Sequence, residues 1–146
     1  MGEPTTYSFL DLSGSIAHPD LGVYIFTGQG IGSVTVSMAN DKTAHDIAAD
    51  GIIMISKIAG QSGTVTISCQ QTSALHKWLL TAYNALYIAP TDSWAQINML
   101  LRNTSDGTSH VVTGASFNKI PDKAYAANGA QVSWVIMAAD IQSLAA

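Results

Sequence analysis

Four polar residues near position 45 have the types and spacing that could support chemistry. Asp41, His45, Asp46 and Asp50 lie close together in the sequence and could bind a metal ion or act as acid and base. On an extended strand, residues 41 and 45 lie on one face and residues 46 and 50 on the other, so the four side chains do not converge. We therefore interpret them as polar residues of an exposed ribbon, and we predict neither a metal ion nor a cofactor.

Cys69 and His76 form a second group, because a cysteine beside a histidine can act as a nucleophile with its base. In the segment TVTISCQQ (64–71), however, Cys69 shares the apolar face with Val65 and Ile67, and buried cysteines are mostly inert. A single cysteine cannot form an internal disulfide, which fits synthesis in a reducing cytoplasm. We predict no catalytic residues, and we expect that the protein is not an enzyme.

Three further patterns have plain structural interpretations. GQGIG (28–32) is followed by a strand, whereas a dinucleotide-binding loop needs a helix there, so we predict a turn. NTS (103–105) matches a glycosylation acceptor, but the N-terminal sequence shows no secretory signal. Trp78, Trp94 and Trp134 lie on separate elements, and large aromatic residues are more often core or interface residues. A carbohydrate-binding β-sandwich that uses Trp94 or Trp134 remains an alternative.

The composition is poor in charge. Only 11% of the 146 residues are Asp, Glu, Lys or Arg, where a soluble domain carries about 25%. The net charge of -4 and the scattered lysines argue against a nucleic-acid clamp, and the apolar runs are too short to span a membrane. Because a monomer needs charge for solubility and to protect its sheet edges, we expect an assembly to cover much of the surface.

Most of the chain is typical of β-strands in a single domain, residues 1–146. The segments expected to be strands outside residues 40–60 are 7–16, 23–27, 33–39, 64–71, 95–103, 109–119 and 130–141. A turn is expected at TSDGT (104–108). The expected fold class is mainly β (α+β), an antiparallel β-sandwich or barrel with one flanking helix and a long hairpin arm.

The helix is predicted over residues 74–87, with Ser73 as its N-cap. Its apolar residues recur at helical spacing and form one stripe, which consists of Leu75, Trp78, Leu79, Ala82 and Leu86. Pro90 follows and cannot continue a helix comfortably. We assign Trp78, Leu79 and Trp134 to the core, and we expect Trp78 to be largely buried between the helix and the sheet.

Residues 40–60 are predicted to form the hairpin arm, with a turn at Asp50-Gly51. Both faces of its second half carry apolar residues, as in a strand that is covered on two sides. An isolated subunit cannot cover both faces, so we expect the arm to be mobile alone and ordered when a neighbour docks. The residues assigned to this inter-subunit arm are Asp41, Lys42, His45, Asp46, Asp50, Ile52, Ile53, Met54, Ile55, Lys57 and Ile58.

Five landmarks occur in a familiar order: YSFLD (7–11), NDKT with AADG (40–51), GQSGTVTI (60–67), LLTAYNAL (79–86) and AYAANGAQVSW (124–134). Together they resemble the proteins that form the inner tail tube of bacteriophages with contractile tails. The resemblance covers nearly the whole chain and implies a β-sandwich subunit with a flanking helix. It also implies that six subunits close a ring around a lumen, that rings stack into a tube, and that the arm reaches the neighbouring ring.

The resemblance further implies the partners and the location. The partners would be other copies of the chain, the surrounding sheath, and the tape-measure protein and double-stranded genomic DNA in the lumen, without sequence-specific binding. The protein would be made and assembled in the host cytoplasm and would reside in the virion tail. We expect a weakly acidic or neutral lumen, along which DNA slides without binding. Another ring-forming component, such as a tail terminator or a secretion-system tube, is the structural alternative.

Overall fold

The computed structural model describes residues 4–27 and 31–145. It confirms a mainly β fold with antiparallel strands and one α-helix, α1 (Ala74–Ile88). Two short 3-10 helices are present, η1 (Phe9–Asp11) and η2 (Thr91–Ser93). The strands are β1 (Leu12–His18), β2 (Gly22–Thr27), β3 (Ile31–Met38), β4 (Thr43–Ile47), β5 (Ile53–Lys57), β6 (Gly63–Gln70), β7 (Ile97–Asn103), β8 (Ser109–Phe117), β9 (Gln131–Ala138) and β10 (Asp140–Leu144).

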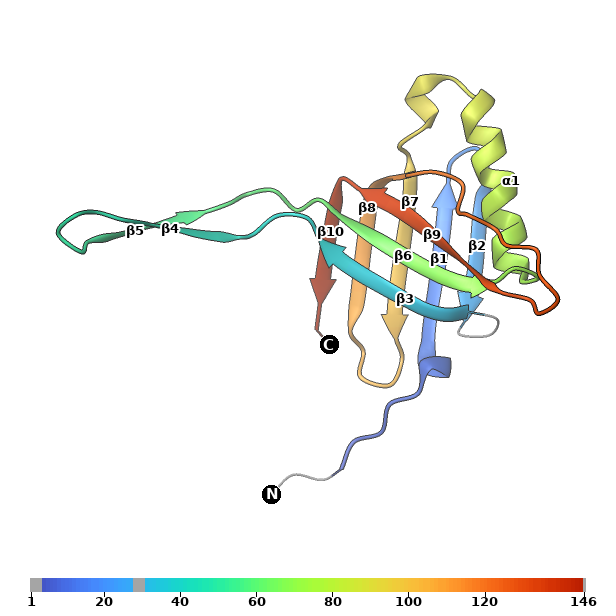
Figure 1. Cartoon of the computed structure of the whole chain (residues 1–146), viewed down its shortest axis with the longest axis horizontal. Coiled ribbons are helices and arrows are strands. Elements are labelled where there is room, and N and C mark those ends of the chain that lie inside the picture. The colour runs from blue at the N-terminus through green and yellow to red at the C-terminus, as the bar shows by residue number, and fades with distance from the viewer. Residues whose placement is uncertain (1–3, 28–30, 146) are drawn as a thin grey trace.

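The large sheet folds over into two layers that enclose the core. Its strand order is β2-β1-β7-β8-β9-β6-β3, and β10 also pairs with β8. Figure 1 shows β3, β6 and β9 crossing obliquely over the other strands. We call β3, β6 and β9 the front layer, and β1, β2, β7, β8 and β10 the back layer. Strand β8 connects the layers, because it pairs with β10 along its first part and with β9 only through Ser116 and Phe117.

The chain turns from the front to the back layer at Ala139, opposite Gly114. The register between β7 and β8 shifts near Gly114, which has a φ of +62°. A Cβ atom there would lie 2.9 Å from the Cβ of Ala139, so the close approach also requires glycine. The prediction of one strand over 130–141 is therefore wrong: β9 ends at Ala138, and β10 begins at Asp140. No glycine or proline in that segment indicates the bend.

Local sequence signals explain most other boundaries. Ser73 caps α1 as predicted, and its side chain accepts a hydrogen bond from the His76 amide at 3.2 Å. The predicted turn at TSDGT is present, and the Asp106 carboxylate accepts bonds from the amide and hydroxyl of Thr108. The strand expected from residue 7 begins only at Leu12, after η1. The turn predicted at GQGIG (28–32) lies largely outside the described residues.

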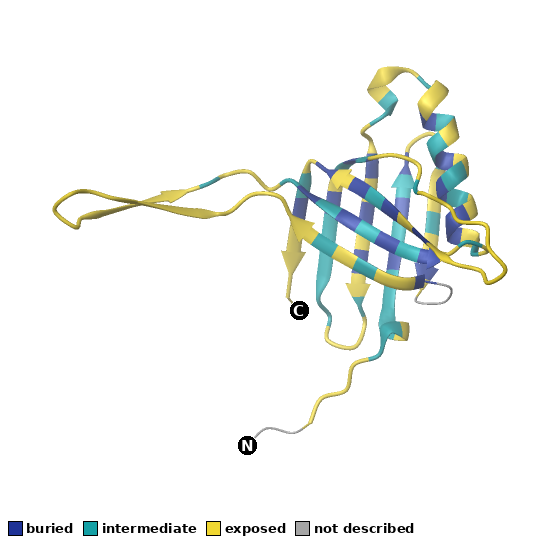
Figure 2. Cartoon of the chain, viewed as in Figure 1, coloured by how far each residue is buried: buried dark blue, intermediate teal, exposed yellow. Residues whose placement is uncertain are grey.

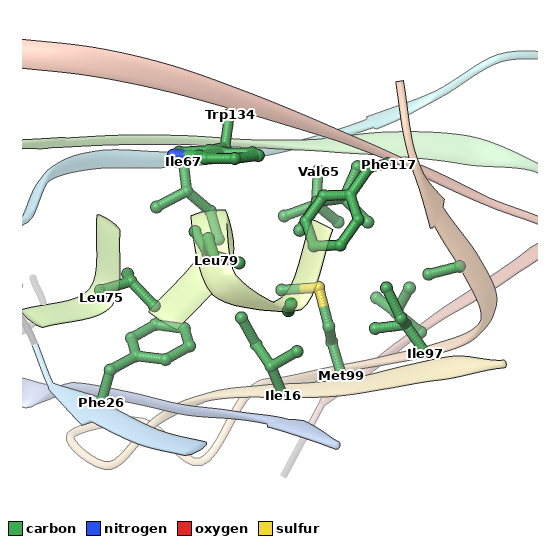
Figure 3. Packing of buried hydrophobic residues seen from close by; sticks show 14 of the residues in the cluster. Ile16, Phe26, Val65, Ile67, Leu75, Leu79, Ile97, Met99, Phe117 and Trp134 are labelled. Carbon is green, nitrogen blue, oxygen red and sulfur yellow. The ribbon is translucent and has the colours of Figure 1, made fainter. Parts of the chain in front are cut away.

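The core lies between the two layers, and α1 closes one side of it (Figure 3). Alternating burial along β6 places Val65, Ile67 and Cys69 inward, as their spacing predicts (Figure 2). Leu79 and Trp134 are fully buried. The core also contains residues from both layers and the helix: Ile16, Phe26, Ile31, Leu75, Ala82, Leu86, Ile97, Met99, Leu101, Val112, Ala115, Phe117, Val132, Ile136, Ala138 and Ile141.

Trp78, expected to be largely buried between the helix and the sheet, is partly buried and packs against the core. Its ring lies 5.5 Å from that of Tyr24 on β2, which is the last strand of the back layer. This contact places Trp78 between α1 and the back layer.

Candidate assembly site

The arm is a two-stranded hairpin that projects away from the two layers (Figure 1). Strands β4 and β5 pair from Thr43 opposite Lys57 to Ile47 opposite Ile53, which confirms the predicted hairpin. The turn is stabilised by Asp50, whose carboxylate accepts a bond from the Ile52 amide at 3.1 Å. Gly51 has a φ of +90°, the left-handed conformation that glycine adopts without strain.

No other part of the chain that the structure describes covers the arm. Every residue from 39 to 57 is exposed (Figure 2). Backbone hydrogen bonds join the two segments at the base of the arm. The Ala39 amide donates to the Ser62 carbonyl at 3.0 Å, and the Ile58 amide donates to the Lys42 carbonyl at 3.0 Å. An isolated two-stranded hairpin is only marginally stable in water. The segment therefore contributes little to the core, and its apolar side chains face solvent.

The register gives the two faces of the arm different chemistry. Ile47 lies directly opposite Ile53, and His45 lies opposite Ile55, so these side chains share one face. Ile47, Ile53 and Ile55 are 67%, 51% and 67% exposed, and we call them the isoleucine cluster. The other face carries the pair Asp46 and Met54. Sequence reasoning missed Ile47, although a turn at Asp50 places it opposite Ile53 at an equal distance from the turn.

The polar residues of the arm do not form a chemical site. His45 and Asp46 are successive residues of β4 and point to opposite faces. Asp41 precedes the strand, and the carboxylate of Asp50 is used in the turn. Among the described residues, no group of three His, Cys, Asp or Glu side chains is arranged to hold a metal ion. Lys42 and Lys57 lie at the end of the hairpin nearest the two layers.

Cys69 and His76 are both buried residues of the core region. Burial raises the pKa of the Cys69 thiol, and a hydrogen bond with Ser73 opposes this only in part. The Nδ1 atom of His76 accepts a hydrogen bond from Nε1–H of Trp134 at 3.0 Å. Burial lowers the pKa of His76, and the positive charge of Lys123 lowers it further. A protonated thiol and an imidazole bonded to Trp134 are suited to packing rather than nucleophilic attack.

The outer face of the back layer exposes large apolar side chains. Val23 and Ile25 on β2 are 63% and 73% exposed, and Leu100 on β7 is 43% exposed. Ser15 on β1 pairs with Ile25 on β2 and with Leu100 on β7. Ile25 and Leu100 therefore lie on the same face of these three neighbouring strands. Contiguous exposed apolar residues of this kind mark protein-binding surfaces. Sequence reasoning missed this face, although the run Val23 to Phe26 is apolar at every position.

Both ends of the strand order are open edges. In the described part of the chain, β3 pairs only with β6, and β2 pairs only with β1. Neither strand carries proline or a charged residue, the usual protection of an edge against pairing with another chain. These two edges, the isoleucine cluster and the apolar face of the back layer are therefore surfaces on which a second chain can dock.

Comparisons with known proteins identify the family. The family model for the bacteriophage PhiTE tail tube protein matches residues 4–145, whereas no curated protein matches the chain. No helix among the described residues is long and apolar enough to cross a membrane.

Several solved structures share the fold at low sequence identity. One is the tube-terminating cap of the anti-feeding prophage, with a TM-score of 0.62, 13% identity, and coverage of 100% of this chain and 95% of that one. Another is the sheath/tube terminator of the PVC extracellular contractile injection system, with a TM-score of 0.63, 12% identity, and coverage of 99% and 100%. A chain of the PVC sheath–tube complex gives a TM-score of 0.56 and 14% identity, with coverage of 91% and 88%. Because the family match spans residues 4–145, the chain belongs to the bacteriophage PhiTE tail tube protein family and has a structural role in a phage tail tube.

Proposed function

We propose that the chain is the repeating subunit of the tube, that six copies close each ring, and that stacked rings conduct double-stranded DNA. The observation that carries the proposal is the arm, which presents the isoleucine cluster to solvent beyond the reach of its own core. Complete burial of a fully exposed isoleucine side chain stabilises a contact by roughly 1.5–3 kcal/mol. With half to two-thirds of each of Ile47, Ile53 and Ile55 exposed, docking on a neighbouring ring stabilises the contact by a few kcal/mol per arm.

Ring closure uses the open edges of the large sheet. An interface between different surfaces of identical subunits closes into a ring when the rotation between neighbours is right, and translation then stacks the rings. Backbone groups of β2 and β3 that lack a partner strand would pair with a neighbouring subunit. This role requires no catalysis, and we propose that the protein is not an enzyme.

The proposed partners follow from the tube. DNA and the tape-measure protein would occupy the lumen, and the sheath would surround the outside of the tube. The presence of the same fold in a PVC sheath–tube complex supports the contact with a sheath. The net charge of -4 and the few lysines are compatible with DNA that passes without being retained. We place the protein in the virion tail, after synthesis and assembly in the host cytoplasm.

A tail terminator, which forms one ring instead of a stack, is the second candidate. It is favoured by the likeness to the anti-feeding prophage cap and to the PVC terminator. The arm argues for the repeating subunit, because an arm that reaches a neighbouring ring can act in every layer of a stack.

Negative-stain electron microscopy of the purified chain tests the proposal. We expect tubes of stacked rings from the wild type; rings that never stack would indicate the terminator, and a monomer would refute both. Deletion of residues 42–57 should leave circular dichroism typical of the folded chain but abolish tubes, because the removed strands lie outside the core. Normal polymerisation of this variant, or its unfolding, would contradict the assigned role of the arm.

A point substitution tests the same contact without shortening the chain. Ile53→Asp should block stacking, because docking would bury a carboxylate without a partner. Asn84→Asp adds the same charge on the exposed side of α1 and is the matched control. Equal stacking by the two variants would show that the isoleucine cluster is not buried between rings.

A further inference from the structure

The outer face of the front layer carries no ionisable side chain. Strand register and alternating burial place eleven residues on this face. Nine of them bear a hydroxyl or an amide group, and the other two are Val135 and Met137. The nine polar residues are Ser33, Thr35, Ser37, Thr64, Thr66, Ser68, Gln70, Gln131 and Ser133.

This composition is unusual even for a chain with few charges. An ordinary soluble surface has roughly 25–35% charged residues, so about three of the eleven would be charged. Elsewhere the chain does place charges on exposed positions, for example Lys77 on α1, Arg102 on the back layer and Lys57 on the arm. The neutral residues also form a continuous surface, since paired positions such as Thr66 and Val135 lie side by side, and the hydroxyls of Ser68 and Ser133 are 2.8 Å apart.

The chemistry of this face restricts what it can contact. It lacks the lysines and arginines that hold phosphates, so it cannot retain DNA through the release of counterions. It also lacks the carboxylates that would repel a polyanion. Only Val135 and Met137 are apolar, in contrast to the back layer, where Val23, Ile25 and Leu100 are exposed together. Hydroxyl and amide groups keep the surface hydrated, because each can bond to water.

We infer that the outer face of β3, β6 and β9 lines the lumen and forms its neutral, hydrated wall. The inference rests on the proposed tube and adds which side of the subunit faces the DNA. The open edge of β3 lies at the margin of this face, so pairing of that edge with a neighbouring subunit continues the neutral surface around the ring. DNA then moves past hydroxyl groups and ordered water without a fixed charge to hold it.

Cysteine accessibility in assembled tubes tests the inference. Thr66→Cys places a thiol at the centre of the face, while the native Cys69 is fully buried and serves as the unreactive background. We expect Thr66→Cys in intact tubes to react with a small maleimide, which diffuses through the lumen, and to lose reactivity toward a maleimide attached to a large protein. The same variant as an unassembled subunit should react with both reagents. Thr35→Cys on β3 is a second variant, in case Thr66→Cys fails to assemble.

Each other outcome contradicts the inference. Reaction of intact tubes with both reagents would place the face outside, and reaction with neither would place it in a subunit interface. Leu100→Cys, on the opposite side of the molecule, is the matched control. In intact tubes its thiol should react with both reagents or with neither. If the wild type forms neither rings nor tubes, the proposed function itself fails; tubes with Thr66 accessible from outside would refute the lumen assignment alone.

Discussion

We predict that the buried pair of His76 and Trp134 makes the stability of the fold depend on pH. Nδ1 of His76 accepts the hydrogen bond from Trp134, so the single proton of the neutral ring is on Nε2. Nε2 is buried and has no hydrogen-bond partner among the residues that the structure describes. Protonation of Nδ1 would direct one N–H group at another and would bury a charge near Lys123. The pKa of His76 is accordingly lowered by burial first and by Lys123 second, from its ordinary value of 6.5.

The direction of the effect follows from proton linkage. Below pH 6.5 the unfolded chain binds a proton at His76, and the folded chain does not until the pH reaches its lower pKa, so stability falls as the pH falls. The loss through this one group is at most about 0.4 kcal/mol at pH 6.5 and about 1.4 kcal/mol at pH 5.5. Above the unfolded pKa, the stabilisation is fully present.

Urea unfolding of the wild type and of His76→Gln between pH 7.5 and 5 measures this loss. Glutamine offers an amide oxygen to Nε1–H of Trp134 but does not titrate in this range. The difference in unfolding free energy between the two proteins should decrease as the pH falls, because the variant lacks this proton linkage. A difference that stays constant over this range would refute the reasoning, since His76 would then titrate alike in the folded and unfolded chains.

Four further substitutions test the packing and the helix cap. Trp134→Ala should lower the free energy of unfolding by about 3–5 kcal/mol, measured by urea denaturation. The partly buried Trp78 should lose less stability when it is changed to alanine. Equal losses would contradict the partial burial of Trp78. Ser73→Ala should cost about 1 kcal/mol, because the His76 amide loses its cap, and an unchanged denaturation midpoint would contradict this. Gly114→Ala should lower the melting temperature in calorimetry, through its positive φ and its approach to Ala139, and a stabilised variant would show that this corner is not constrained.

Local patterns predicted the elements that depend on local physics. The alternation in TVTISCQQ predicted that Val65, Ile67 and Cys69 face inward, and Ser73 predicted where α1 begins. The bend at Ala139 was missed because its cause is not local. Its position is fixed by Gly114, which is adjacent to Ala139 in space but distant from it in the sequence. For the same reason the apolar stripe of α1 does not show that Trp78 packs against Tyr24 of β2, because Tyr24 is distant in the sequence.

The hairpin of the arm was predictable from the sequence, but the full set of its clustered isoleucines was not. The segment Ile52 to Ile55 has apolar residues on both faces. This pattern is typical of a buried central strand, and it fits an uncovered hairpin equally well. The Asp50-Gly51 turn favoured the hairpin, and the register then shows that Ile47 completes the isoleucine cluster. That a neighbouring subunit covers this cluster stays a prediction. It is supported by energetics, because an exposed apolar hairpin with two open edges would be a site of uncontrolled aggregation unless assembly gives it a defined partner.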